Sequence, residues 1–291
     1  MKKKSSNIKK TRVWLWLTPS FSLLIFVGVI PFFIVLSLSF MDYFMLYPNI
    51  PRVFVGLKNF KYLVFDPWMF TSLAISFIFT GVAVSLELLI GLGLALLLSR
   101  PVKGITIYRT LILAPMVIAP LVVGLIWMQM LNPEFGIITY FLHKLGLFIG
   151  TGPTISAALP SVIIMDVWHW TPFTTLIILA GILSLPKEPF EAALIDGASK
   201  WQVFRHIIVP LIRYPILVAF LLRFMEAFKI FDEIWLLTGG GPGDATRVAS
   251  IHAYKISFYR WDLGYGSAIC IFLEYIVIIL CVIFYNLLRR K

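Results

Sequence analysis

The sequence predicts an all-α integral membrane protein with six transmembrane helices. Of its 291 residues, 60% are hydrophobic and 13% are charged, whereas a soluble domain carries about a quarter charged residues. A helix needs about 20 mostly apolar residues to cross a bilayer, and six stretches of the chain satisfy this requirement. The expected spans are 14–40, 70–98, 110–131, 160–184, 214–237 and 266–288.

The first span follows a basic N-terminal tail, residues 1–13. This tail resembles the start of a signal peptide, but the apolar stretch after it is too long for one and lacks an A-x-A cleavage pattern. We therefore expect an uncleaved first span. Residues 14–288 are expected to form a single six-span domain, and residues 289–291 a second short tail.

The positions of the basic residues predict the orientation of the chain. Most of its 25 lysines and arginines lie in the N-terminal tail, in the loops after the second and fourth spans, and in the C-terminal tail. Basic residues are enriched on the cytoplasmic side of membrane proteins. Both termini are therefore expected in the cytosol. The formal net charge of +11 reflects topology, so no nucleic-acid partner is needed to explain it.

The loop between the fourth and fifth spans, residues 187–212, carries the signals of two short helices. Pro189 suits the first turn of a helix, and Gly197 suits the position just after a helix ends. Ser199 and Gln202 have the spacing of a capping box at the start of a second helix. The sequence therefore predicts a structured loop.

The second of these helices has an apolar face formed by Trp201, Phe204 and Ile208, and Pro210 is expected to end it. Two interpretations are open on physical grounds. The helix could lie flat on the inner leaflet, or it could dock on a cytosolic partner.

The same loop resembles a known signature. Binding-protein-dependent ABC importer permeases carry the pattern E-A-A-x3-G-x9-I-x-L-P. The matching residues here are Glu191, Ala192, Ala193, Gly197, Ile207 and Pro210. The chain departs from the pattern at one position, where Val209 replaces Leu and keeps an apolar side chain before the proline.

Three further segments extend the resemblance along the chain. They are WLTPSFSLLIFVGVIPFF (16–33), FVGLKNFKYLVFDP (54–67) and GGGPGDAT (239–246). They are similar to the first span, the first external loop and the loop after the fifth span of carbohydrate permeases. The resemblance is to the maltose-type branch of the family, and to its MalF-like subunit.

The resemblance implies a function and a set of partners. The chain would move a carbohydrate or polyol from an external solute-binding protein into the cytosol by alternating access. It would sit in the bacterial cytoplasmic (inner) membrane, paired with a second homologous permease subunit. The loop would be an EAA coupling helix, with Glu191, Ala192, Ala193 and Gly197 contacting one of two cytosolic ATPase subunits.

Energy is expected to come from those partners. The chain has no G-x-x-x-x-G-K-[ST] motif, so ATP and Mg²⁺ would bind to the ATPase subunits and no cofactor to this chain. We expect no enzymatic activity, because the sequence shows no nucleophile–base constellation. No metal site is expected either, since the four histidines share no ligand spacing.

Ionisable residues inside spans are candidates for the solute pathway. A sugar is bound by flat aromatic faces and by groups that bond its hydroxyls. The candidates are Asp166, Trp168, Trp170, Arg223 and Glu226. Structural roles are the alternative: Arg223 could pair with Glu226 and Asp166 with His169 at i, i+3. The two tryptophans could instead belong to an interfacial aromatic belt.

Two other classes of protein compete with the importer. One is an ATP-independent secondary transporter or channel, which an internal repeat would favour, although none is visible. The other is a membrane-embedded enzyme. The sequence leaves the solute open among maltose, trehalose, a polyol, a raffinose-type oligosaccharide and glycerol 3-phosphate.

Overall fold

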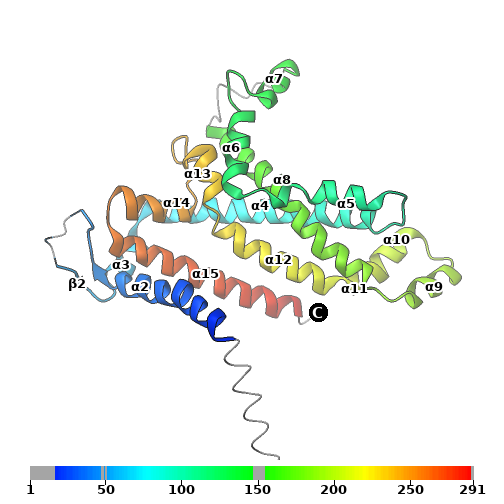
Figure 1. The fold of residues 1–291 in the computed structure, drawn as a ribbon, viewed down its shortest axis with the longest axis horizontal. Helices are drawn as coiled ribbons and strands as arrows, with labels where there is room; N and C mark the ends of the chain where they lie inside the picture. The colour runs from blue at the N-terminus through cyan, green and yellow to red at the C-terminus, as the bar shows by residue number, and fades with distance from the viewer. Residues whose placement is uncertain (1–16, 47–48, 50, 147–154, 290–291) are drawn as a thin grey trace, which may run out of the picture. The chain divides into compact units, whose positions relative to one another are not determined.

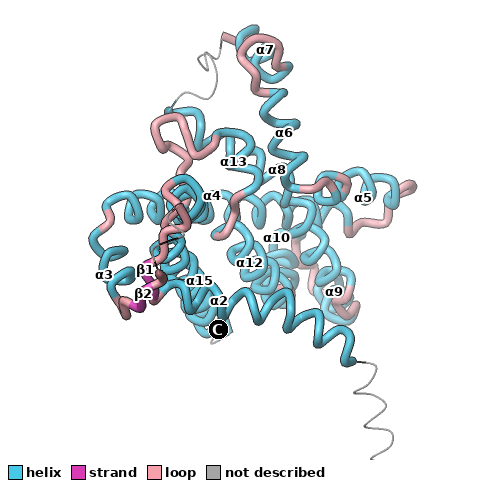
Figure 2. The backbone as a smooth tube through the Cα atoms, turned by 60° about the vertical axis from the view of Figure 1, so that its left-hand side comes forward, coloured by secondary structure: helices cyan, strands magenta, loops and turns pink. Residues whose placement is uncertain are grey.

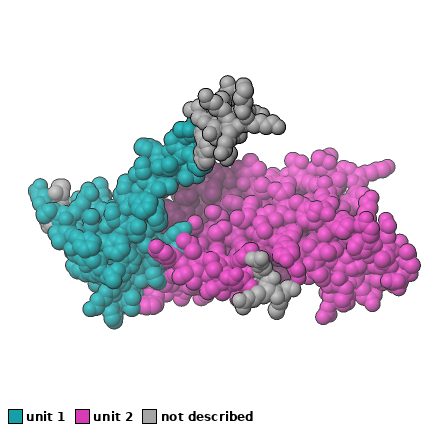
Figure 3. All heavy atoms as spheres, turned by 90° about the horizontal axis from the view of Figure 1, so that it is seen from below, with its two compact units in different colours: residues 1–66, 253–274 teal, residues 67–252, 275–291 magenta. Residues whose placement is uncertain are grey.

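A computed structural model describes residues 17–46, 49, 51–146 and 155–289 of the chain. The predicted all-α class is confirmed, because these residues are overwhelmingly helical (Figures 1 and 2). The chain divides into two compact units (Figure 3). The first contains residues 1–66 and 253–274, and the second contains residues 67–252 and 275–291.

The first unit combines the N-terminal helices with the start of the last helix. Its elements are η1 (Ile25–Val29), α2 (Ile30–Ser39), β1 (Met41–Asp42), β2 (Val53–Phe54), α3 (Lys58–Phe65), η4 (Lys255–Tyr259) and the beginning of α15 (Leu263–Arg289). The two short strands pair antiparallel. The Asn59 side-chain amide fixes the chain reversal after α2, because it donates to the carbonyls of Ser39 and Met41 at 2.9 Å each.

Two charged residues of this unit have shifted pKa values. The hydrogen bond from Lys58 to Asp42, together with their opposite charges, raises the pKa of the Lys58 ammonium. Burial raises the pKa of the Asp262 carboxyl, which lies just before α15 and accepts the backbone N–H of Tyr265 at 2.9 Å. Asp262 therefore caps the last helix at the expense of partial desolvation.

The second unit is built on three helices, α4 (Pro67–Leu98), α8 (Ile155–Leu183) and α12 (Arg213–Phe228), which pack on one another. Small and polar residues let the first two approach closely. A Cβ placed on Gly91 of α4 would collide with Thr174 Oγ1 of α8. Close approach at glycine is typical of helix pairs in membranes.

The shorter elements of the second unit surround this trio. They are α5 (Ile105–Leu113), η2 (Pro115–Val117), α6 (Pro120–Met130), α7 (Ile137–Lys144), α9 (Glu188–Ile195), α10 (Lys200–Val203), η3 (Phe204–Ile208), α11 (Val209–Leu211), α13 (Asp232–Thr238) and α14 (Ala249–Tyr254). Helix α13 packs against α6. The apolar core includes Phe79, Val123, Val162, Met165, Ile234 and Ile251.

Four of the six predicted spans are single helices long and apolar enough to cross a membrane. They are Leu17–Ser39, Pro67–Leu98, Ser156–Leu183 and Leu263–Leu287. Their positions match the first, second, fourth and sixth stretches within a few residues. Residues 14–16 of the first predicted span, together with the N-terminal tail and residues 290–291, lie outside the described part of the chain.

The third and fifth stretches are broken, which differs from the single helices that the sequence predicts. In the third, Ala119 is extended (ψ 138°) directly before Pro120, as expected because a proline disfavours the helical conformation of the residue before it. In the fifth, α12 ends at Phe228 and α13 begins at Asp232. At this break Ser250 Oγ donates a hydrogen bond to the carbonyl of Ile230.

Candidate functional site

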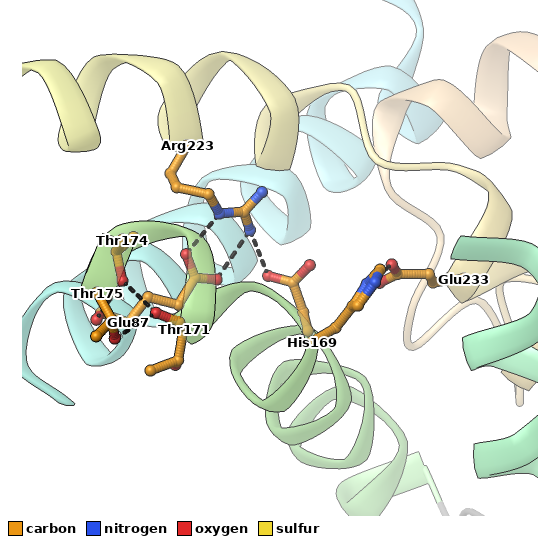
Figure 4. A network of polar contacts seen from close by, with 8 residues as sticks. Glu87, His169, Thr171, Thr174, Thr175, Arg223 and Glu233 are labelled. Carbon is orange, nitrogen blue, oxygen red and sulfur yellow. Dashed lines mark hydrogen bonds and ion pairs between the residues drawn. The ribbon is translucent and has the colours of Figure 1, made fainter. Parts of the chain in front are cut away.

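A buried ionic network joins the three central helices of the second unit (Figure 4). Arg223 of α12 donates from Nε to Glu87 Oε2 of α4 at 2.5 Å and from Nη2 to Glu87 Oε1 at 2.8 Å. The same Nη2 donates to Asp166 Oδ2 of α8 at 2.9 Å. All three side chains are at most 1% exposed. The forked pairing with Glu87 is the strong, directional geometry that arginine makes with carboxylates.

A second pair lies next to this network. His169 follows Asp166 by three residues on α8, and its Nδ1 lies 2.6 Å from Glu233 Oε1 of α13. Its Nε2 lies 3.0 Å from the carbonyl of Ile118. A carbonyl only accepts, so Nε2 carries a proton, and one further proton is shared between Nδ1 and Glu233. The break in the third stretch thus supplies a carbonyl that orients His169.

Threonines of α8 complete the polar contacts. Thr174 Oγ1 donates to the carbonyls of Glu87 and Thr171, at 2.9 Å each, and Thr175 Oγ1 donates to Thr171 at 2.8 Å (Figure 4). The bond to Glu87 runs between helices. It fixes α8 against α4 at the residue that also holds Arg223.

The pairings at i, i+3 that the sequence left open are replaced by pairings between helices. Arg223 binds Glu87 and Asp166, while Glu226 lies on the exposed side of α12. His169 binds Glu233. The reason is burial: a charged group deep in a protein needs partners that meet its geometry, and neighbouring helices offer these better than the next turn of the same helix.

A cavity of about 150 Å³ opens beside the network. Four of the five predicted solute-pathway residues line it: Asp166, Trp170, Arg223 and Glu226. The Trp170 ring lies over the Arg223 guanidinium, with 4.8 Å between the guanidinium carbon and the ring centroid. Trp168 is not part of the cavity lining; it is 41% exposed and packs against Trp127.

Two buried oxygens at this cavity have no hydrogen-bond partner among the described residues. They are Asp166 Oδ1 and Glu233 Oε2, and both residues line the cavity. Buried polar atoms without partners are uncommon and costly. A ligand or water with hydroxyl donors would satisfy both oxygens.

The residues of this site that sequence reasoning missed include Phe231, Asp232 and Glu233. The two carboxylates fall within the predicted fifth span, so the rule that flags ionisable residues in spans applies to them as well. What the sequence could not show is the break before α13, which turns Glu233 towards His169. In the described part of the chain, no group of three or more His, Cys, Asp or Glu residues is placed to hold a metal ion.

The second candidate site is the loop between α8 and α12, where the structure confirms the predicted helix signals except the end of the second helix. Pro189 lies in the first turn of α9, and Gly197 adopts φ +70° just after this helix. The N–H of Gly197 bonds the carbonyl of Leu194 at 3.2 Å, and that of Ala198 bonds Ala193 at 2.9 Å. This pair of bonds is a Schellman motif.

The capping box of the second helix is also present. Ser199 Oγ accepts the N–H of Gln202 at 3.3 Å, and the Gln202 side chain accepts the N–H of Ser199 at 2.7 Å. The helix continues past Pro210, which the sequence predicts as its end, and stops at Leu211. The preceding π-helical turn, η3, widens the backbone before the proline, where an N–H is lacking.

The loop presents apolar side chains to the outside. Leu194, Ile195 and Trp201 are 81%, 86% and 64% exposed. A groove of about 800 Å³ lies between the loop and the end of α4. Its lining includes the predicted apolar face of Trp201, Phe204 and Ile208. Exposed apolar surface next to a groove is typical of a binding surface.

Comparison with known proteins decides the family. Residues 87–291 match the model of the binding-protein-dependent transport system inner membrane component. The chain belongs to this family. It is also 37% identical over 246 residues to the trehalose/maltose transport system permease protein MalF of Thermococcus litoralis. The aligned region covers 82% of this chain and 81% of that protein.

Other relatives agree. The trehalose transport system permease protein SugA of Mycobacterium tuberculosis is 33% identical over 286 residues, covering 97% of this permease and 90% of SugA. Among solved structures, a bacterial ABC transporter involved in alginate import superposes with a TM-score of 0.83 at 19% identity, covering 100% of this permease and 99% of that chain. This likeness shows that the permease fold is shared.

The permease is therefore a component of a membrane transport system. The part of the chain that matches the family model begins at Glu87, the residue that holds Arg223, and includes the whole loop between α8 and α12. Both candidate sites thus lie in the region that defines the family.

Proposed function

We propose that the permease imports a carbohydrate or polyol, taken from an external solute-binding protein, by alternating access. Relatives named for trehalose and maltose transport support this solute class. The observation that carries it is the cavity beside Arg223, where an aromatic plane, Trp170, meets two buried carboxylate oxygens without partners. A sugar offers an apolar ring face for the first and hydroxyl donors for the second.

The solute pathway in this proposal includes Asp166, Trp170, Arg223 and Glu226. The two tryptophans offer a matched test, because Trp168 lies on the same helix but outside the cavity lining. We expect Trp170→Ala to reduce uptake of radiolabelled sugar by membrane vesicles strongly, and Trp168→Ala to leave it near the wild-type rate. Equal losses in both variants would remove Trp170 from the pathway.

In the membrane, we propose six crossings with both termini in the cytosol. The third and fifth crossings would each use a broken stretch, α5 to α6 and α12 to α13. Irregular backbone at membrane depth is tolerated where it is buried in protein. The distribution of basic residues supports a cytosolic position for the loop between α8 and α12.

This loop would couple the permease to ATP hydrolysis. Two cytosolic ATPase subunits, binding ATP and Mg²⁺, would complete the transporter together with a second homologous permease. The contact would centre on Glu191, Ala192, Ala193 and Gly197, with Ile207 and Pro210 shaping the second helix. The exposed apolar residues of the loop, together with the groove beside them, support a docking role.

Two glycines provide a controlled test of coupling. Gly197 and Gly146 have φ of +70° and +71°, and among the described residues neither has an atom within 4 Å of an added Cβ. Valine at either position costs about 1–2 kcal/mol of backbone strain. We expect Gly197→Val to abolish solute-stimulated ATP hydrolysis and uptake, and Gly146→Val to preserve both.

The rival of an ATP-independent transporter is tested by co-purification. We expect the tagged permease, extracted from its native membrane, to retain an ATPase subunit through gel filtration. Uptake that continues in vesicles depleted of ATP, without any associated ATPase, would contradict the importer mechanism.

A further inference from the structure

We infer that the cavity beside Arg223 selects uncharged solutes and rejects anionic ones. This inference rests on the proposed function, because it assigns a substrate class to the same cavity. It narrows the solutes to neutral sugars and polyols, and it argues against sugar phosphates and sugar acids.

The charges that line the cavity are unequal. Asp166, Glu226, Asp232 and Glu233 contribute four carboxylates, and the only cationic side chains in the lining are Arg223 and Lys229. An anion entering this space meets more negative than positive charge. Asp166 and Glu233 are buried, where repulsion is stronger than in water, whereas Glu226, Asp232 and Lys229 are exposed and act through solvent.

Arg223 is the cation that an anionic solute would be expected to bind, but it already forms ion pairs with Glu87 and Asp166. Its Nε and Nη2 donate to both oxygens of Glu87 and to Asp166, and Trp170 covers the guanidinium. Glu87 is not part of the cavity lining, but it adds a further negative charge next to Arg223. An anion would have to displace these carboxylates to gain the arginine.

The negative excess does not depend on one protonation state. With Glu87 included, five carboxylates face two cations and His169, which lies against Glu233. If His169 is protonated and one carboxyl is neutral, the group still carries a net negative charge. The argument therefore holds however the proton between His169 and Glu233 is placed.

The unpartnered oxygens point to the chemistry that does fit. Asp166 Oδ1 and Glu233 Oε2 are buried acceptors without donors among the described residues, and a neutral polyol supplies O–H donors without adding charge. A cavity of 150 Å³ holds a molecule the size of benzene, so this cavity of about the same volume suits a small polyol or part of a sugar next to Trp170.

The test compares solutes that differ only in charge. The tagged permease is purified with its partner subunits, placed in lipid nanodiscs without any solute-binding protein, and titrated by calorimetry. The probe pairs are trehalose with trehalose 6-phosphate, glucose with glucuronate, and glycerol with glycerol 3-phosphate. The charge variants are Glu226→Gln and Asp232→Asn, both at exposed positions outside the Arg223 ion pairs, and Glu134→Gln is the control outside the cavity lining.

We expect the neutral member of at least one pair to bind roughly tenfold or more tighter than its anionic partner. The double variant Glu226→Gln, Asp232→Asn should narrow this ratio severalfold, whereas Glu134→Gln should not change it. Tighter or equal binding of the anionic members overturns the inference and leaves the importer function intact. Binding of no probe overturns the inference as well, and co-purification of an ATPase then decides separately whether the importer function stands.

Discussion

Removing the charge of Arg223 should destabilise the permease more than neutralising any other charged residue of α12. In Arg223→Met the arginine side chain is replaced by an apolar one of similar length, and Glu87 and Asp166 remain buried without their cation. Breaking a buried ion pair by removing one partner costs about 3–5 kcal/mol. Since two carboxylates lose their partner here, we expect the upper end of that range.

The assay is thermal unfolding of the purified permease in detergent, followed by tryptophan fluorescence. A loss of about 5 kcal/mol corresponds to a fall of about 8 °C in the midpoint for a chain of 291 residues. Arg213→Met, an exposed charge at the start of the same helix, serves as the control and should change the midpoint by only a degree or two.

A triple variant separates the ion pair from simple packing. Combining Arg223→Met with Glu87→Met and Asp166→Asn removes all three charges, and apolar replacement of a whole buried ionic group is often neutral or stabilising. The triple variant should therefore regain most of the lost stability. The reasoning is refuted if Arg223→Met is as mild as Arg213→Met, or if the triple variant is as unstable as the single one.

Two further predictions concern helix packing and pH. Gly91→Val should lower the free energy of unfolding by about 1–3 kcal/mol, because its side chain would collide with Thr174. The control is Gly93→Val on the same helix, since no described atom lies within 4 Å of a Cβ added there. Equal losses of both variants in unfolding assays would contradict the packing argument. Asp262→Asn keeps an acceptor for the N–H of Tyr265. Because burial raises the pKa of Asp262, folding favours its protonated form, and the resulting stabilisation is present below its ordinary pKa and lost as the pH rises through the raised value. The unfolding midpoint of Asp262→Asn, measured relative to the wild type, should therefore rise as the pH goes from acidic to neutral. A difference between the two midpoints that stays constant with pH would count against this prediction.

The sequence was most informative where local rules decide the structure. The loop at Gly197, Ser199 and Gln202 follows from capping chemistry, since each bond joins residues within a few positions of one another. The four unbroken spans follow from length and apolarity. These features need no knowledge of what lies across the fold.

The partners of the buried charges could not be predicted in the same way. Arg223 bonds Glu87 across 136 positions of sequence, and nothing in the spacing distinguishes this partner from Glu226 one turn away. His169 was visible as a polar residue in a span, but its two partners come from the two broken stretches. Pro120 marks the first break, whereas the break at residues 229–231 contains neither proline nor glycine.

The single ionic junction at Arg223 also has a mechanical consequence. The segment between α8 and α12 is attached to this junction at both ends. Through α8 it is joined by about 26 Å of helix, from Asp166 to Leu183, and through α12 by about 15 Å, from Arg213 to Arg223. The ion pairs of Arg223 hold these two helices to each other and to α4, so α8 and α12 can slide past one another only if these ion pairs break. We therefore expect a force applied to this segment to be passed to α4, α8 and α12 together at Arg223.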